Sequence, residues 1–183
     1  MLAAREILIA ILEGMGEIWP DGSWVDSIAI GDAAYHEAVK RSDITDGIVP
    51  FHKLSQWMSY SLIEPLQVAG IKIINLDSLT GLAEYRNGGL FIDTGTISLR
   101  DKTQLGKVHD PKSPLIVEWR ALTVTLLDQL AEQIRQQTNT NSESMPLVSI
   151  LQGGTWSAGR RIAQRLRAHA SPPLRLKSRG TIF

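Results

Sequence analysis

The chain has no cysteine among its 183 residues. Disulfide frameworks, thiolate zinc sites and cysteine nucleophiles are therefore excluded, and the absence fits the cytoplasmic location that we expect. The chain also has no excess charge of either sign, because 19 Lys and Arg residues balance 19 Asp and Glu residues. A broad electrostatic surface for duplex nucleic acid is therefore not expected, although a local basic patch is compatible with this composition.

Long hydrophobic runs are also lacking. The apolar opening MLAAREILIAILEGMG is interrupted by Arg5, Glu6 and Glu13, and it is shorter than the roughly 20 residues that a membrane span requires. It lacks the basic start and unbroken apolar stretch of a signal peptide. With 43% hydrophobic and 21% charged residues, the composition predicts one globular domain over residues 1–183 without membrane association.

Apolar residues at helical spacing predict a mainly α fold. We expect helices over residues 2–17, 53–69, 115–137 and 155–168, the second bent or restarted at Pro65. A further short helix is expected to begin at Asp32 as its N-cap and to run through Arg41. In the segment 89–99, GLFID fits a helix whereas TGTISLR alternates like a strand. The prediction is thus a single helical domain with one small β element.

Two helices are expected to bury their apolar faces. In the second helix these residues are Leu54, Trp57, Met58, Leu62 and Leu66. In the long third helix they are Trp119, Leu122, Leu126, Leu127, Leu130 and Ile134.

The main candidate site is the segment LTGLAEYRNGGLFIDTG. Here Glu84, Arg86, Asn87 and Asp93 surround a Gly88-Gly89 pair within an otherwise apolar stretch. Polar groups in such a stretch are tolerated when they are paired or functional, and glycines let a ligand approach the backbone closely. The alternative is an exposed turn whose carboxylate caps a helix.

Three further polar groups are candidates for ligand binding, each with a structural alternative. They are His52, Lys53 and Gln56 at the start of the second helix, Glu118 and Arg120 on either side of Trp119, and Trp156 with Arg160 in LQGGTWSAGRR. Glycines before a helix start, followed by arginines, would suit a phosphate, but the spacing and lysine of a P-loop are missing. The alternatives are a structural histidine, a solvated helix flank and a plain glycine-rich loop.

Asp32 and His36 have the spacing of metal ligands on a helix. Two residues do not make a metal site, so we expect a cap and a surface pair, and we expect no metal or other cofactor.

Four segments carry a resemblance to a known family. In FHKLSQWMSYSLIEPL, LTGLAEYRNGGLFIDTG, VEWRALTVTLLDQLA and LQGGTWSAGRRIA, and in the final TIF, the chain resembles the C-terminal half of the uracil catabolism protein four family. More faintly, EYRNGGLFIDTGTI and VEWRALTV are similar to queuosine-salvage N-glycosidases, helical enzymes akin to DNA glycosylases. The resemblance implies a DNA-glycosylase-like helical fold and a uracil-degrading route through a ribosylated urea.

These resemblances imply an N-glycosidase-type hydrolase acting on a ribosylated, 5′-phosphorylated urea or pyrimidine-derived molecule. A carboxylate would stabilise the oxocarbenium-like state and take a proton from water. Glu84 would fill this role, and Asp93 would orient it or bind ribose hydroxyls. The expected substrate-binding residues are His52, Lys53, Gln56, Arg86, Asn87, Glu118, Arg120, Trp156 and Arg160.

Two other functions stay open. The chain could be a non-catalytic or half-enzyme subunit that binds a nucleoside-like ligand and docks on an N-terminal partner chain or on a second copy of itself. The basic segment GRRIAQRLRAHASPPLRLKSR would suit a reader of nucleic-acid lesions, but the balanced overall charge disfavours a nucleic-acid partner.

Overall fold

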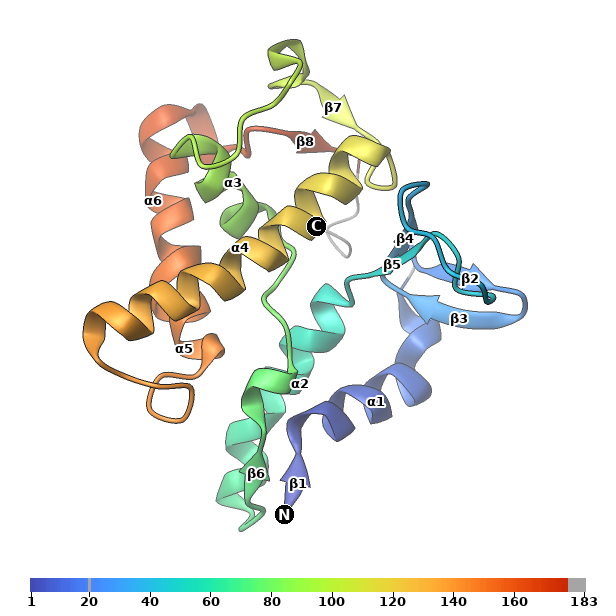
Figure 1. Cartoon of the computed structure of the whole chain (residues 1–183), viewed down its shortest axis with the longest axis vertical. Helices are drawn as coiled ribbons and strands as arrows, with labels where there is room; N and C mark the ends of the chain where they lie inside the picture. The colour runs from blue at the N-terminus through green and yellow to red at the C-terminus, as the bar shows by residue number, and fades with distance from the viewer. Residues whose placement is uncertain (20, 178–183) are drawn as a thin grey trace. The chain divides into compact units, whose positions relative to one another are not determined.

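A computed structural model describes residues 1–19 and 21–177 of the chain (Figure 1). The mainly α class predicted from the sequence is confirmed. Instead of one β element, the described residues form four small two-stranded sheets. They group into two compact units, one formed by Met1–Thr80 and one that begins at Gly81. Within the described ranges, none of the helices has both the length and the apolar character needed to cross a membrane.

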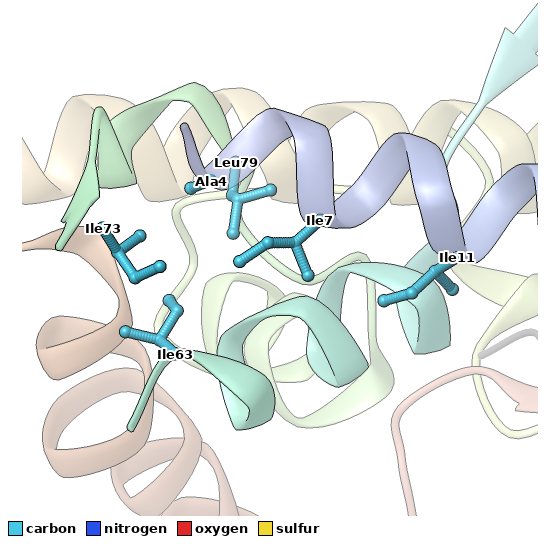
Figure 2. Packing of buried hydrophobic residues seen from close by; sticks show 6 residues of the cluster. All are labelled: Ala4, Ile7, Ile11, Ile63, Ile73 and Leu79. Atoms are coloured by element: carbon cyan, nitrogen blue, oxygen red, sulfur yellow. The ribbon is translucent and has the colours of Figure 1, made fainter. Parts of the chain in front are cut away.

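Two helices form the core of the first unit. They are α1 (Ala4–Met15) and α2 (Lys53–Val68), and they pack against each other. The buried apolar cluster combines residues at helical spacing on α1 with one residue of α2 and two residues that follow α2 (Figure 2). The cluster consists of Ala4, Ile7, Ile11, Ile63, Ile73 and Leu79. Burial of these side chains stabilises the pair of helices by removing apolar surface from water.

Three pairs of short strands complete the first unit. The strand β1 (Leu2–Ala3) pairs in parallel with β6 (Ile73–Ile74), so the start of α1 is tied to the segment that follows α2. Two antiparallel pairs lie between the helices in the sequence. They are β2 (Ser23–Val25) with β3 (Ile28–Gly31), and β4 (Ala33–Tyr35) with β5 (Ile48–Pro50).

The predicted helix from Asp32 to Arg41 is wrong, because β4 occupies its beginning. Asp32 is nevertheless a helix-capping residue. Its carboxylate accepts a hydrogen bond of 2.9 Å from the backbone N–H of Lys53, the first residue of α2. The cap thus acts on a helix 21 positions further along the chain. Asp32 and His36 do not share a helix, so their spacing does not place them on one face.

The buried face of α2 differs from the prediction. Trp57 is 48% exposed and Leu62 is 38% exposed, whereas Lys53, Gln56 and Ser59 are buried. Polar side chains can occupy a buried face when they find partners. Gln56 does so through its Oε1 atom, which accepts the N–H of Thr80 at 3.2 Å.

The second unit is built from helices. They are α3 (Tyr85–Asp93), α4 (Pro114–Thr138), α5 (Leu147–Ile150) and α6 (Trp156–Leu166), with η3 (Lys102–Gln104) as a short 3₁₀ turn. The strands β7 (Val108–His109) and β8 (Arg175–Leu176) form a parallel pair. The helix α3 packs against both α4 and α6, so it is the central element of this unit.

Two predictions for the second unit need correction. The residues from Thr94 to Arg100 form no strand, and the chain leaves α3 through a turn in which Gly95 has a φ of +78°. On α4, Trp119 and Leu127 are buried as predicted, but Leu122 is 47% exposed and Arg120 is buried in its place. Hydrophobic periodicity identified the helix but not its full buried face, because a polar residue with partners can replace an apolar one in a core.

The glycines of LQGG do not precede a helix start. Leu151–Thr155 is a π-helical turn that joins α5 to α6 without interruption, and the N–H of Trp156 donates to the carbonyl of Leu151. Consequently α6 does not offer the free N–H groups that were expected to bind a phosphate. The final TIF of the resemblance lies outside the described residues.

Asp101 is expected to titrate at an unusually low pH. A hydrogen bond from the Gln104 side chain, then two from Thr103, lower the pKa of this carboxyl from 3.8 to about 2. The stabilisation of η3 by Asp101 is therefore fully present above the unfolded pKa of 3.8 and is lost as the pH falls through about 2. The chemical shift of the Thr103 amide proton, followed by NMR from pH 5 to pH 1.5, should report this midpoint. A midpoint near 3.8 would show that the cap does not form.

Candidate functional site

Glu84 lies at the N-terminus of α3 and caps it. Its backbone is extended, with φ of −127° and ψ of 156°, and its Oε1 atom accepts the backbone N–H of Asn87 at 2.8 Å. The residue is only 5% exposed, so the alternative of an exposed turn is wrong in its exposure, whereas its helix-capping carboxylate is confirmed. The positive end of a helix dipole and an N–H donor both stabilise a negative charge at this place. Glu84 is therefore a buried carboxylate in a fixed position.

Asn87 connects the start of α3 to two other segments. Its Nδ2 atom donates to the carbonyl of Leu82 at 3.1 Å, and its Oδ1 atom accepts the hydroxyl of Thr155 at 2.9 Å. Thr155 belongs to the π-helical turn before α6, and π-turns occur frequently at functional sites. The side chain of Asn87 thus links the start of α3 to the segment before Glu84 and to the π-helical turn.

The glycine pair after Asn87 permits close packing of helices. A Cβ on Gly88 would lie 2.6 Å from the Thr123 hydroxyl and 2.9 Å from the Trp119 ring, and one on Gly89 would lie 3.2 Å from Pro173. The Nε1 atom of Trp119 donates to the carbonyl of Gly88 at 3.0 Å. The glycines were expected to let a ligand approach the backbone. In the structure, side chains of α4 approach the backbone of Gly88 instead.

Asp93 is not beside Glu84. It ends the nine-residue helix that Glu84 caps, which separates their backbones by about 13 Å at 1.5 Å per residue. Its carboxylate binds Arg167 through two parallel hydrogen bonds of 2.7 and 2.5 Å. The expectation that Asp93 orients Glu84 is thus not supported, since Arg167 takes both carboxylate oxygens.

Arg86 and Arg160 are brought together as the walls of one pocket of about 430 Å³. Arg167 and His169 line the same pocket, and we call it the cationic pocket. The guanidinium of Arg160 lies 5.6 Å from the ring centroid of Trp156, so this tryptophan supports the arginine by a cation–π contact. Arg167 and His169 were noted only as part of the basic segment GRRIAQRLRAHASPPLRLKSR, and their place beside Arg86 could not be predicted because Arg167 and its partner Asp93 are 74 positions apart.

Glu118 and Arg120 lie in different surroundings. Arg120 is 1% exposed, whereas Glu118 is exposed and lines a larger groove of about 570 Å³ together with Trp119 and Leu122. Glu118 therefore lies on a solvated helix flank, as the structural alternative predicts, whereas Arg120 does not.

The remaining predicted residues belong to the first unit. Lys53 and Gln56 are buried there, while His52 has a positive φ of 50° at the N-cap of α2. Across the described ranges, no three His, Asp or Glu side chains gather closely enough to hold a metal ion.

Comparison with known proteins gives this geometry a family context. The family model described as "Protein of unknown function (DUF1688)" matches residues 1–183. Protein urg3 of Schizosaccharomyces pombe is 41% identical over 169 residues, which cover 91% of this chain and 41% of that protein. Uracil catabolism protein 4 of Lachancea kluyveri is 38% identical over 202 residues, which cover 98% of this chain and 45% of that protein. The predicted resemblance is thus confirmed, and the chain spans less than half the length of these relatives.

A shorter similarity connects the chain to another kind of protein. Queuine tRNA-ribosyltransferase of Pseudomonas syringae pv. tomato is 34% identical over 92 residues, which cover 49% of this chain and 24% of that protein.

Proposed function

The chain belongs to the family of proteins of unknown function DUF1688, and we propose that it acts in uracil catabolism as an N-glycosidase-type hydrolase. Its substrate would be a ribosylated, 5′-phosphorylated urea or pyrimidine-derived molecule. The pathway is suggested by the printed name of the relative Uracil catabolism protein 4. The reaction is suggested by the buried, fixed carboxylate of Glu84, which is the observation that carries the proposal.

The proposed chemistry requires a carboxylate close to the anomeric carbon. The C–N bond breaks, its electron pair leaves with the nitrogen, and positive charge develops on the ribose. Glu84 would stabilise this charge and take a proton from the attacking water, whose oxygen forms the new bond to the anomeric carbon. The proton then passes to the departing nitrogen, so the products are a free sugar hydroxyl and urea or base.

A buried carboxylate suits this task better than an exposed one. Water screens an exposed charge strongly, whereas a charge in a low-dielectric site acts more strongly on a nearby cationic centre. The hydrogen bond from the N–H of Asn87 holds the Glu84 carboxylate in one orientation before substrate binds. Positioning of this kind reduces the reorganisation needed at the moment of reaction.

Glu84→Gln is expected to lower hydrolysis at least about 100-fold, the lower end of the range for loss of an acid–base group. Glutamine keeps an oxygen that can accept the N–H of Asn87, so the cap survives while the charge is lost. The measurement is release of urea or base from ribosylurea, its 5′-phosphate, UMP and a purine nucleotide. Glu132→Gln is the matched control, because Glu132 is an exposed carboxylate of α4 with 63% of its side chain accessible.

Full activity in Glu84→Gln would remove this mechanism. A folded wild type that turns over none of the four compounds would instead favour a ligand-binding half-enzyme subunit. That second function is supported by the partial match, since more than half of Protein urg3 and of Uracil catabolism protein 4 lies outside the aligned region. Restored turnover on addition of the unmatched region of such a relative would then identify the missing partner.

A further inference from the structure

The cationic pocket of the second unit gathers positive charge from three elements. Arg86 comes from the first turn of α3, Arg160 from α6, and Arg167 from the segment that follows α6, where His169 also lines the pocket. None of the described residues that line this pocket is acidic. Like charges held together repel one another, so such an arrangement is stabilised when an anion enters.

The charges of the pocket are only partly balanced by the protein. Asp93 neutralises Arg167 by accepting two hydrogen bonds from it. Neither Arg86 nor Arg160 has an ion pair with any residue in the described ranges; each guanidinium instead lies over an aromatic ring, Tyr85 and Trp156 respectively. Aromatic faces position a guanidinium and leave its N–H groups available for a ligand.

Arg86 also has unused hydrogen-bonding capacity. One of its terminal nitrogens donates to the carbonyl of Ala170 at 2.9 Å. Its Nε atom is buried and has no hydrogen-bond partner in the part of the chain that the structure describes. A buried N–H group without a partner is costly, and an anionic oxygen would satisfy it.

The backbone beside these arginines is strained. His169 and Ala170 have φ values of +57° and +51°, in the left-handed region that a residue with a Cβ atom rarely adopts. Two arginines hold this turn, since Arg86 binds the carbonyl of Ala170 and Arg167 binds that of Ser171 at 2.6 Å. Strain that is maintained by surrounding contacts is frequent at ligand-binding sites.

We propose that the cationic pocket binds the phosphate group of a small phosphate monoester. Planar guanidinium groups bind phosphate oxygens through paired hydrogen bonds, and His169 adds a further donor. Arg86 lies in the first turn of α3, the helix that Glu84 caps, so a residue of the pocket and the proposed catalytic carboxylate belong to the same end of one helix. The inference rests on the proposed function for the identity of the ester as the 5′-phosphate of a ribosylated substrate.

A small ligand fits the pocket better than a nucleic-acid strand. The positive residues converge on one hollow of about 430 Å³, which is within the range of small-molecule sites. Single-stranded nucleic acid is bound along an extended groove in which aromatic side chains stack on successive bases. The overall charge of zero also does not provide the broad positive surface that such binding uses.

Calorimetric titration with ribose 5-phosphate tests the pocket. Arg160→Ala is expected to raise the Kd at least tenfold, which corresponds to ~1.4 kcal/mol. Arg161→Ala is the matched control, because it removes the same charge from the next position of α6, which is also exposed, without altering the lining. This control should change the Kd by no more than about twofold, since Arg161 does not line the pocket. Ribose should bind far more weakly than ribose 5-phosphate, and inorganic phosphate should compete with the ester.

Three outcomes would overturn the assignment. They are equal weakening by Arg160→Ala and Arg161→Ala, equal affinity for ribose and its phosphate, and tighter, steeply salt-dependent binding of a single-stranded oligonucleotide. Circular dichroism of both variants verifies that the fold is retained.

The two proposals fail separately. Binding without any hydrolysis supports the phosphate pocket and counts against the hydrolase. Hydrolysis of a phosphorylated substrate that Arg160→Ala leaves unchanged overturns the pocket and leaves the role of Glu84 standing.

Discussion

Gly159→Ala is expected to destabilise the second unit by about 3 kcal/mol or more, at the upper end of the range for overpacked cores. A Cβ atom at this position of α6 would lie 2.1 Å from the carbonyl oxygen of Arg86 and 2.9 Å from its carbonyl carbon. Both atoms belong to the backbone of α3, so a side-chain rotation cannot relieve the contact and the two helices must separate. Chemical denaturation of the wild type and the variant gives the difference in unfolding free energy.

Gly153→Ala is the control for this prediction. Gly153 lies in the same continuous helical run, and a Cβ added there has no neighbouring atom within 4 Å. Replacing a glycine in an exposed helix stabilises it by up to about 1 kcal/mol. If both variants lost stability equally, the cost would come from the glycine positions in general and not from the approach of α6 to α3.

Arg167→Ala is the second substitution with a large expected effect, a loss of about 3 kcal/mol. The side chain of Asp93 is 4% exposed in its ion pair, and removing the partner of a buried charge typically costs about 3–5 kcal/mol. The lower end applies because the Arg167 side chain is 26% exposed, so water can reach part of the site. Thermal unfolding and chemical denaturation should both show the loss.

Two further variants isolate the ion pair. Glu132→Ala removes the carboxylate partner of Arg135 and should cost less than about 1 kcal/mol, because Glu132 is 63% exposed to screening by water and Arg135 keeps its hydrogen bond to the carbonyl of Met145. Asp93→Asn combined with Arg167→Ala should be more stable than Arg167→Ala alone, because it leaves no uncompensated buried charge. A double variant no better than the single one would mean that the loss arises from the bond between Arg167 and the carbonyl of Ser171.

These stability effects bear on function because the same contacts build the site. Gly159 lets α6 reach the backbone of Arg86, and Asp93 holds Arg167 at the cationic pocket. A positioning role for Asp93 therefore replaces the expected role next to Glu84. Variants of these residues should be tested for folding before any loss of hydrolysis is assigned to chemistry.

Local sequence patterns were sufficient for four of the helices, although they also predicted a helix from Asp32 to Arg41 that does not form. The predictions for residues 2–17, 53–69, 115–137 and 155–168 correspond to α1, α2, α4 and α6. Each has apolar residues at helical spacing, and this pattern depends only on neighbours within a few turns. Glu84 was also identified as a candidate from local sequence, because a carboxylate next to glycines in an apolar stretch is conspicuous.

The partners of the polar residues could not be predicted in the same way. The pattern on α2 placed Trp57 inside, whereas the structure exposes it and buries Gln56, whose partner Thr80 is 24 positions away. Helical spacing separates two faces of a helix but does not say which face is covered when both can be buried. That choice is made by the elements packed against the helix.

By itself the sequence thus determined the helical class, the main helices and the segment around Glu84, since these follow from periodicity and composition over short distances. Only the tertiary structure decided that Asp32 caps α2, that Asp93 binds Arg167, and that Arg86 and Arg160 share a pocket. These contacts join residues 21 to 74 positions apart. Their formation depends on how helices and turns pack, and no local pattern of residues records that packing.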